Sequence, residues 1–516
     1  MSTIRLDGIQ QPLPESGQPR RAGTLAQVTS TQRAQRCVPS LTRVPVTCYP
    51  EPEPSQGEPD LVSVRVRVRV GESDLERKLR ARSARIAIVG LGYAGLPMAV
   101  EFARAGFSCV GLDVDTSKVG AVSRGRSPVS NVADADIAAL RHAGQLEASS
   151  DPKVLDTADV AVICVPTPLT ASGGPDLRFV ESAGSTIARH LHAGMLVVLQ
   201  STCGPGTTST RLAPLLERDS GLRAGEDFFV VFAPERIDPG NARFNVKNTP
   251  KLVGGVTPES TRLGCLLYEA CIDEIVPVSS PEIAELAKLV ENTFRFINIS
   301  FINEMALLCD RLGVNVWEVI EAAKTKPFAF LPHYPSPGVG GHCIPVVPQY
   351  LQASATEHGL TGELIPAANR VNDAMPKLVV DKLERALEER RGRRLLNARV
   401  LLVGVTYKAD IADVRESAAL RVFQEAFKRG ARVSYHDPLM PSVRVDGETV
   451  RSVALEASEI ELADAVVLLT PHTNLDYDRL IRLAPLVLDT HSGLQPREAP
   501  NVVNMWVPQL PSTILA

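Results

Sequence analysis

The sequence predicts an α/β protein with two doubly wound, Rossmann-like domains, joined by a long central helix and preceded by a disordered extension. Short apolar runs alternate with helical patterns in both halves of the folded part, as in parallel sheets covered by helices. One helical pattern runs without interruption from Ser279 to Leu312. The first 80 residues are rich in Pro, Gln, Ser and Arg, a composition typical of a disordered segment. We therefore expect an extension over 1–80, a first domain over 81–278, a central helical region over 279–385 and a second domain over 386–516.

Length and composition narrow the class of protein. A chain of 516 residues is too long for one core. A net charge of −4 offers no basic surface for nucleic acid, and no apolar run of 18 residues could span a membrane. The nine cysteines form no CxxC pair and no zinc-binding spacing, so we expect no metal site. Scattered thiols and an N-terminus without an apolar signal region predict a cytoplasmic protein.

The extension admits other interpretations. Val64 to Val70 alternates valine and arginine, which would suit one exposed strand, but low-complexity sequence is the simpler interpretation. An Arg-rich transit peptide is a further alternative, although its prolines would break an amphipathic helix. We exclude this segment from the fold.

The first domain opens with a dinucleotide-binding pattern. The apolar run Ile86–Val89 leads directly into GLGYAG and a helix, and a second strand, Ser108–Leu112, ends at Asp113. Glycines in this context allow a tight turn and a close approach of pyrophosphate to the helix N-terminus. Asp113 would accept the ribose hydroxyls and repel a 2′-phosphate, so NAD is favoured over NADP. The cofactor residues of this loop are Gly90, Gly92, Tyr93, Ala94 and Gly95.

Three more strands end in polar residues. The strand at 159–165 leads to Thr167, the strand at 195–199 leads to Thr202, and the strand at 228–232 leads to Glu235 and Arg236. Ligands of doubly wound sheets bind beyond the carboxyl ends of the strands, so these side chains should converge there. Helix capping or turn formation is the alternative for each threonine.

The central helix carries a polar pair. Lys288 and Asn292 are four residues apart and share one helix face. A solvated lysine is the alternative interpretation. An apolar stripe along a helix of this length is suited to a dimer interface.

A cysteine stands at the end of a loop rich in glycine and proline. Pro335–Pro345 contains three glycines and three prolines around Cys343. Glycine allows close backbone approach and proline fixes the chain path, so the thiol is presented like a nucleophile. A surface turn with an incidental cysteine is the alternative.

The second domain repeats the strand–helix pattern. The strand Arg399–Gly404 is followed by Lys408 and Arg415, which are placed at its carboxyl end to hold phosphate or carboxylate. Two such domains around a cysteine loop imply two nucleotide-like ligands.

With these motifs, the chain resembles the UDP-glucose/GDP-mannose dehydrogenase family from about Arg85 to about Ser492. The motifs, in the family's order, are GLGYAGLP, VPTPL, STCGPGTT, PERIDPGN, the Lys288/Asn292 helix, GVGGHCIP and GVTYKADIADVRES. The segment NTPKLVGG together with GGHCIP is similar to the UDP-N-acetylglucosamine 6-dehydrogenase branch.

The resemblance implies a four-electron oxidation of a UDP-sugar C6 alcohol to the uronate, with NAD as cofactor and a homodimer through the central helix. It implies Cys343 as the nucleophile, Lys288 and Asn292 as alkoxide stabilisers, and Glu235 with a water on Thr202 for proton transfer. The implied cofactor residues are those of the glycine loop with Asp113, Lys118, Thr167, Thr202 and Arg415. The implied substrate residues are Glu235, Arg236, Lys288, Asn292, Tyr334, Gly338, Gly340 and Lys408.

One position departs from the family pattern. Val347 stands four residues after the cysteine, where the family normally has an aspartate thought to position water. Gln200 and Ala409 are milder departures from the glutamate and lysine common there. A catalytically silent homologue that binds UDP-sugar and NAD is therefore an alternative. A two-electron hydroxyacid or 6-phosphogluconate-type dehydrogenase is a further alternative, but such an enzyme would have no use for the cysteine loop or the second domain.

Overall fold

The computed structural model describes residues 73–170, 173–238, 240–241, 243–492 and 499–507. The predicted disordered extension lies outside these residues except at its end. There the prediction is wrong, because Asp74–Arg80 forms helix α1. Ser73 caps this helix, and Leu75 and Leu79 are buried in the core of the first domain. The first domain therefore begins one helix earlier than its apolar strands indicated.

The first domain is built on an eight-stranded sheet of order β3-β2-β1-β4-β5-β6-β7-β8. All neighbouring strands are parallel except β6 and β7. The strands are β1 Arg85–Val89, β2 Ser108–Leu112, β3 Leu146–Ser149, β4 Val160–Ile163, β5 Leu196–Leu199, β6 Phe229–Phe232, β7 Lys251–Gly255 and β8 Ile275–Val278.

Strand register brings the expected ligand-binding loops to one edge. Val89 pairs with Leu112 and with Ile163, and the same row continues through Leu199 to Phe232. The loops after β1, β2, β4, β5 and β6 therefore begin side by side, as the sequence predicted.

Helices cover both faces of this sheet, and a separate apolar cluster fills each face. They are α2 Gly95–Arg104, α3 Thr116–Ser123, α4 Asp134–His142, η1 Pro152–Thr157, α5 Arg178–Ala188, η2 Thr207–Leu212, α6 Ala213–Ser220 and α7 Pro258–Tyr268.

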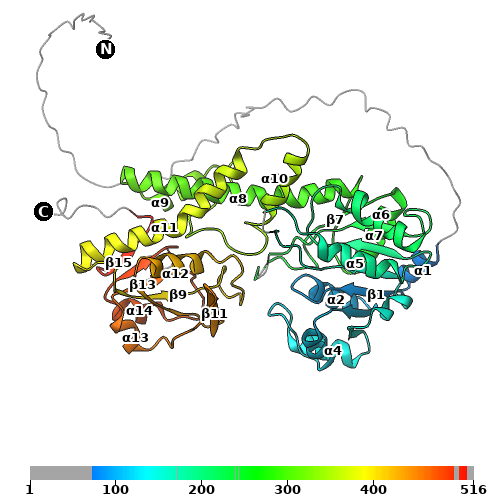
Figure 1. The fold of residues 1–516 in the computed structure, drawn as a ribbon, viewed down its shortest axis with the longest axis horizontal. Coiled ribbons are helices and arrows are strands. Elements are labelled where there is room, and N and C mark those ends of the chain that lie inside the picture. The colour runs from blue at the N-terminus through cyan, green and yellow to red at the C-terminus, as the bar shows by residue number, and fades with distance from the viewer. Residues whose placement is uncertain (1–72, 171–172, 239, 242, 493–498, 508–516) are drawn as a thin grey trace, which may run out of the picture. The chain divides into compact units, whose positions relative to one another are not determined.

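The central region is helical. It consists of α8 Pro281–Leu312, α9 Val316–Lys324, α10 Val347–Glu357 and α11 Leu364–Arg391. Helix α8 packs against both α10 and α11 (Figure 1). The predicted domain boundary at residue 385 falls inside α11, six residues before that helix ends at Arg391.

The second domain has a five-stranded parallel sheet of order β10-β9-β13-β14-β15 and a hairpin, β11–β12. One face packs on α8, α9 and α11 through a shared apolar cluster. The elements are β9 Arg399–Val403, α12 Ala418–Lys428, β10 Arg432–His436, β11 Ser442–Val445, β12 Glu448–Arg451, α13 Ala457–Leu462, β13 Ala465–Leu468, α14 Tyr477–Leu483, β14 Val487–Asp489 and β15 Val502–Asn504.

Candidate active site

The glycine-rich turn after β1 has the geometry that a bound pyrophosphate requires. Gly90 has φ +103°, and a Cβ on it would lie 2.6 Å from the carbonyl oxygen of Cys164. A Cβ on Gly95 would clash with Gly90 O, so only glycine lets α2 start this close to β1. No side chain caps the N-terminus of α2 at Ala94, and space beside Gly92 is open. The free N–H groups of this helix end therefore suit an anionic ligand.

Asp113 lies at the end of β2 beside the glycine turn. Its Oδ2 accepts hydrogen bonds from Leu91 N at 2.7 Å and from Lys118 Nζ at 3.3 Å, while Oδ1 accepts from Asp115 N at 2.9 Å. The structure thus brings two predicted cofactor residues, Asp113 and Lys118, into contact. A fixed carboxylate at this point fits the ribose of a dinucleotide, and with the uncapped helix it fits NAD.

Thr167 and Thr202 follow β4 and β5 at the same sheet edge. Thr167 is buried, and its carbonyl oxygen accepts a 2.6 Å hydrogen bond from the Tyr350 hydroxyl of α10. Thr202 is half-buried, and its hydroxyl has no hydrogen-bond partner within the described residues. The Thr202 side chain is therefore available to a ligand or water.

The Glu235 carboxylate is held by four donors. Oε1 accepts from the backbone N–H groups of Arg236 at 2.9 Å and Ile237 at 3.1 Å. Oε2 accepts from Gln200 Nε2 at 3.2 Å and Lys251 Nζ at 3.3 Å. Two donors on each oxygen fix the carboxylate in place.

The lysine behind Glu235 is deeply buried. The Lys251 side chain is 4% exposed, and its ammonium lies 5.0 Å from the ring centroid of Tyr268. The Tyr268 hydroxyl donates to Gln200 Oε1 at 3.0 Å, which orients the Gln200 amide toward Glu235. Burial raises the pKa of Tyr268 well above its ordinary value, so this hydroxyl stays a donor. We did not predict Lys251 as a site residue, although a lysine beginning an otherwise apolar strand is an unusual signal.

Lys288 and Asn292 lie one turn apart on α8, as predicted. Both are buried, and Asn292 Nδ2 donates to the Lys288 carbonyl at 3.3 Å. Within the described residues no hydrogen bond or ion pair occupies the Lys288 ammonium. This ammonium is therefore available to a ligand.

Glu285, one turn before Lys288, ties α8 to the loop after β5. This fully buried carboxylate accepts from Gly206 N at 2.6 Å, Thr208 N at 2.9 Å and Thr208 Oγ1 at 2.6 Å. Burial raises the pKa of Glu285 despite these donors. We missed this residue because its partners are 77 and 79 positions away.

The cysteine loop is anchored at three points. Ser336 N donates to Asn303 Oδ1 of α8 at 2.9 Å, and Val339 N donates to Asn372 Oδ1 of α11 at 2.7 Å. Gly341 N donates to Arg415 O of the second domain at 3.0 Å. A Cβ on Gly340 would lie 2.9 Å from Tyr407 Cβ, so the motif needs glycine for close packing.

Cys343 is exposed at the end of this anchored loop. Val347 N donates to Cys343 O at 2.9 Å where α10 begins. The Val347 side chain is 2% exposed and packs with Leu289 and Tyr350. Burial and the nearby Arg415 lower the pKa of His342 below its ordinary 6.5, so this imidazole is neutral at pH 7.

Arg236 and Tyr334, both predicted to bind substrate, have other partners in the structure. Arg236 Nη2 lies 2.6 Å from Glu291 Oε1 of α8, and its Nη1 donates to Pro250 O at 2.8 Å. Tyr334 stacks on Trp317 of α9 and donates to Glu321 at 2.9 Å. These contacts fix the orientation of each side chain.

Lys408 and Arg415 come from the loop after β9. Lys408 Nζ lies 2.8 Å from Asp238 Oδ1. The Arg415 guanidinium binds the Asp413 carboxylate, with Nη2 2.6 Å from Oδ2, and lies 5.3 Å from the ring centroid of Tyr93. Arg415 thus contacts a residue of the predicted dinucleotide loop.

Comparisons with known proteins match both domains and the central region. Profiles of the UDP-glucose/GDP-mannose dehydrogenase family match in three parts: its NAD binding domain over residues 84–272, its central domain over 282–374 and its UDP binding domain over 401–496. The chain belongs to this family. It is an oxidoreductase with NAD as its cofactor, as the sequence predicted.

Relatives of this dehydrogenase differ in the sugar that their names give. The chain is 37% identical over 358 residues to UDP-N-acetyl-D-glucosamine 6-dehydrogenase of Pseudomonas aeruginosa, which covers 69% of this chain and 83% of that protein. It is 36% identical over 390 residues to UDP-N-acetyl-D-mannosamine dehydrogenase of Pyrococcus horikoshii, covering 75% of this chain and 89% of that protein. It is 35% identical over 431 residues to NDP-N-acetyl-D-galactosaminuronic acid dehydrogenase of Ralstonia solanacearum, covering 81% of this chain and 97% of that protein.

Solved structures share the fold. A UDP-D-ManNAc dehydrogenase from Pyrococcus horikoshii superposes with a TM-score of 0.73 at 33% identity, covering 81% of this chain and 97% of that chain. A UDP-glucose dehydrogenase from Pyrobaculum islandicum gives a TM-score of 0.73 at 29% identity, covering 82% of this chain and 98% of that chain. The predicted α/β fold with two Rossmann-like domains is confirmed. Among the described residues, no helix of this dehydrogenase is both long and apolar enough to cross a membrane.

Proposed function

We propose that this dehydrogenase oxidises the C6 alcohol of a UDP-N-acetylhexosamine to the uronate. The substrate that we favour is UDP-N-acetylglucosamine, and the product serves surface polysaccharide synthesis. The observation that carries the proposal is Cys343, exposed on a loop that is anchored to α8, α11 and the UDP binding domain. An alcohol-to-aldehyde oxidation alone has no use for a presented thiol, whereas acid formation through sulfur requires one.

The first oxidation uses the polar pair on α8. The Lys288 ammonium and the Asn292 amide lie one turn apart on α8, where they stabilise the alkoxide that forms as the C6 hydroxyl loses its proton. Bound NAD supplies the acceptor for the hydride that leaves C6 in each of the two oxidations. The product of this step is the C6 aldehyde.

The second oxidation passes through the thiol. The Cys343 thiolate adds to the aldehyde carbon to form a thiohemiacetal, whose loss of hydride leaves a thioester. Water then attacks the thioester carbon, and the C–S bond breaks to release the uronate and the thiol. A water held between the Thr202 hydroxyl and the fixed Glu235 carboxylate is oriented for proton transfer in this sequence.

A catalytically impaired homologue is the second candidate, and Val347 favours it. This side chain is buried against Leu289, next to Lys288, and can neither accept nor donate a proton. Loss of a positioned acid–base group costs roughly 10²–10⁴-fold in rate. In this alternative both ligands bind and the reaction stops at the aldehyde or thioester.

The stripe of apolar side chains on α8 supports a homodimer. Seven of them are 42–66% exposed and recur every three, four or seven residues: Ile283, Leu286, Val290, Phe294, Phe301, Leu308 and Leu312. This is the periodicity of a helix face that packs on another helix. Sedimentation velocity of the wild type and of Phe301→Lys tests it; a dimer that becomes a monomer supports the proposal, and a monomeric wild type contradicts it.

Substrate assignment is tested by comparing kcat/KM for UDP-linked N-acetylglucosamine, N-acetylgalactosamine and N-acetylmannosamine with NAD. We expect the highest value for the N-acetylglucosamine form. NADH formation from none of the three, with both ligands binding in calorimetry, would establish the impaired homologue instead.

A further inference from the structure

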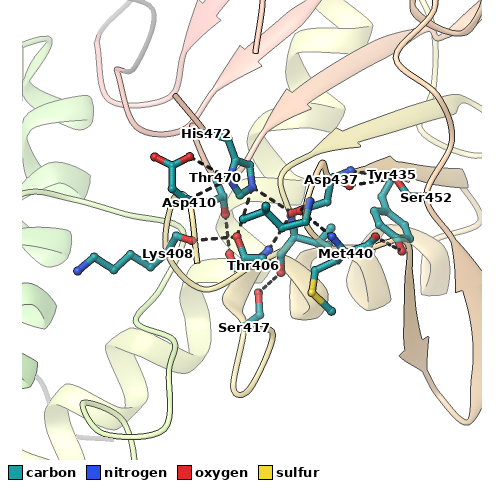
Figure 2. A network of polar contacts seen from close by, with 12 residues as sticks. Thr406, Lys408, Asp410, Ser417, Tyr435, Asp437, Met440, Ser452, Thr470 and His472 are labelled. Carbon is teal, nitrogen blue, oxygen red and sulfur yellow. Dashed lines mark hydrogen bonds and ion pairs between the residues drawn. The ribbon is translucent and has the colours of Figure 1, made fainter. Parts of the chain in front are cut away.

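The second domain repeats the loop geometry of the first but closes the site that would hold a ribose. After β1, Leu91 N donates to Asp113 Oδ2 at 2.7 Å; after β9, Val405 N donates to Asp437 Oδ2 at 2.7 Å. The difference is that His472, which is fully buried, lies 3.1 Å from the same Asp437 oxygen (Figure 2). The acid in the second domain is therefore engaged inside the protein.

The Asp437 carboxylate has no room for a ligand. Besides His472 and Val405, the backbone N–H groups of Thr406, Leu439 and Met440 donate to it, at 3.2, 2.9 and 3.2 Å. Burial alone would raise the pKa of Asp437, but the bonds from His472 and the backbone amides more than offset burial, so its pKa is lowered. Asp437 is a buried anion that organises the loop around it.

The hydrogen bonds of His472 define its tautomer. The backbone N–H of Asp410 donates to His472 Nδ1 at 3.0 Å, so Nδ1 carries no proton. The proton of the neutral ring is then on Nε2, which faces Asp437 Oδ2 and, at 3.3 Å, Thr406 Oγ1. The ring thus connects Asp437, which directly follows β10, to Asp410, which ends the loop of residues 404–410.

This loop is fixed on both sides of Lys408. On one side, Thr406 Oγ1 donates to Lys408 O at 2.9 Å and Thr470 Oγ1 donates to Thr406 O at 2.7 Å. On the other side, Asp410 takes φ +62°, a left-handed conformation that is strained for a non-glycine residue. The bond to His472 holds Asp410 in this conformation, and Thr473 N adds a 3.0 Å bond to Asp410 Oδ1.

The side chain of Lys408 points away from this network (Figure 2). Its ammonium lies 2.8 Å from Asp238 Oδ1.

We propose that His472 is a positioning residue for substrate binding, which holds Asp410 and the 404–410 loop so that Lys408 is presented to the UDP-sugar. The inference rests on the proposed function, because the family resemblance assigns Lys408 to the substrate of that reaction. His472 itself touches no ligand.

Two matched variants of the full chain separate the two bonds of the ring. His472→Asn places an amide oxygen near the Nδ1 position and keeps the acceptor for Asp410. His472→Gln places an amide N–H near the Nε2 position and keeps the donor to Asp437 but not the acceptor. The measurements are hydrogen exchange of the 404–412 peptide and calorimetric affinity for UDP-N-acetylglucosamine without NAD.

The proposal expects faster exchange in 404–412 and roughly three- to tenfold weaker sugar binding for His472→Gln, as for the loss of one hydrogen bond. It expects His472→Asn to stay closer to wild type in both, and NAD affinity to be unchanged in both variants. Equal behaviour of the two variants, or a lower melting temperature with unchanged exchange in 404–412, would overturn it.

Lys408→Met separates this result from a failure of the proposed function. If Lys408→Met binds the sugar nucleotide as wild type does, the assignment of Lys408 to substrate is wrong, and the positioning role is overturned with it. If Lys408→Met weakens binding while neither His472 variant does, only the role of His472 is overturned.

Discussion

Lys251 Nζ lies 3.3 Å from Glu235 Oε2; the lysine side chain is buried, and the glutamate side chain is 17% exposed. Lys251 begins β7, whose remaining residues are apolar or glycine. An ammonium this deeply buried is stable only with a partner of opposite charge. The pair therefore explains why a lysine occupies this strand and why Glu235 has a fixed orientation.

Removing the ammonium should disable Glu235 without changing either ligand pocket. In Lys251→Met this carboxylate loses its cation, and we expect kcat to fall roughly 10²-fold or more. KM for NAD should stay near the wild-type value. Lys251→Arg is the matched control that keeps the charge. A Lys251→Met enzyme with wild-type kcat would show that the pair is structural only.

Val347→Asp restores the aspartate that the family normally has four residues after the cysteine, and it tests how much activity is lost with valine at this position. Val347→Asp places a carboxylate one turn from Cys343 and next to the α8 segment that carries Lys288, which lacks a partner among the described residues. We expect faster release of uronate, by roughly 10²-fold or more if hydrolysis is limiting. Val347→Asn is the isosteric control that cannot take up a proton. Equal steady-state uronate formation in wild type and Val347→Asp would contradict a hydrolysis block.

The Asn372 anchor should affect chemistry more than substrate affinity. Asn372→Leu removes the acceptor for Val339 N, and the loss of one buried hydrogen bond, about 1 kcal/mol, loosens the cysteine loop. Labelling of Cys343 by iodoacetamide should then change in rate and kcat should fall several-fold, with KM for NAD unchanged. Asn372→Asp keeps an acceptor oxygen and should behave more like wild type. Identical kinetics for Asn372→Leu and the wild type would show that the other two anchoring hydrogen bonds are enough to hold the cysteine loop.

Asp437 gives a pH-dependent contribution to stability. Because its pKa is lowered from 3.8, its contribution is complete above pH 3.8 and is lost as the pH falls through the lower folded-state value. Asp437→Asn should therefore be less stable than wild type at pH 7, by about 1–3 kcal/mol, and the difference should narrow below pH 3.8. Denaturant titrations of both proteins from pH 7 to pH 3 measure this, and a constant difference would contradict it.

Local patterns in the sequence predicted the parts of the site that depend on local structure. GLGYAG could be interpreted because a strand precedes it and a helix follows, and the polar residues after β4, β5 and β6 meet because parallel strands end at one edge. The Lys288 and Asn292 pair follows from helical spacing alone.

Contacts between distant segments could not be predicted in this way. Lys251 and Glu235 are 16 residues apart, Glu285 and Thr208 are 77 apart, and His472 and Asp410 are 62 apart. Each pair depends on how strands and helices pack, which periodicity does not encode. Helix α1 was missed for a related reason: it is short, and it is stabilised by burial of Leu75 and Leu79 in the first domain.

The most direct test of the account is the number of NADH formed per sugar consumed. Purified protein is incubated with UDP-N-acetylglucosamine and excess NAD, beside a Cys343→Ser variant that has lost the thiol. The account predicts two NADH per sugar with continued turnover in the wild type, and no uronate in the variant. One NADH per sugar in the wild type, with aldehyde accumulating as in the variant, would contradict a thioester route through Cys343.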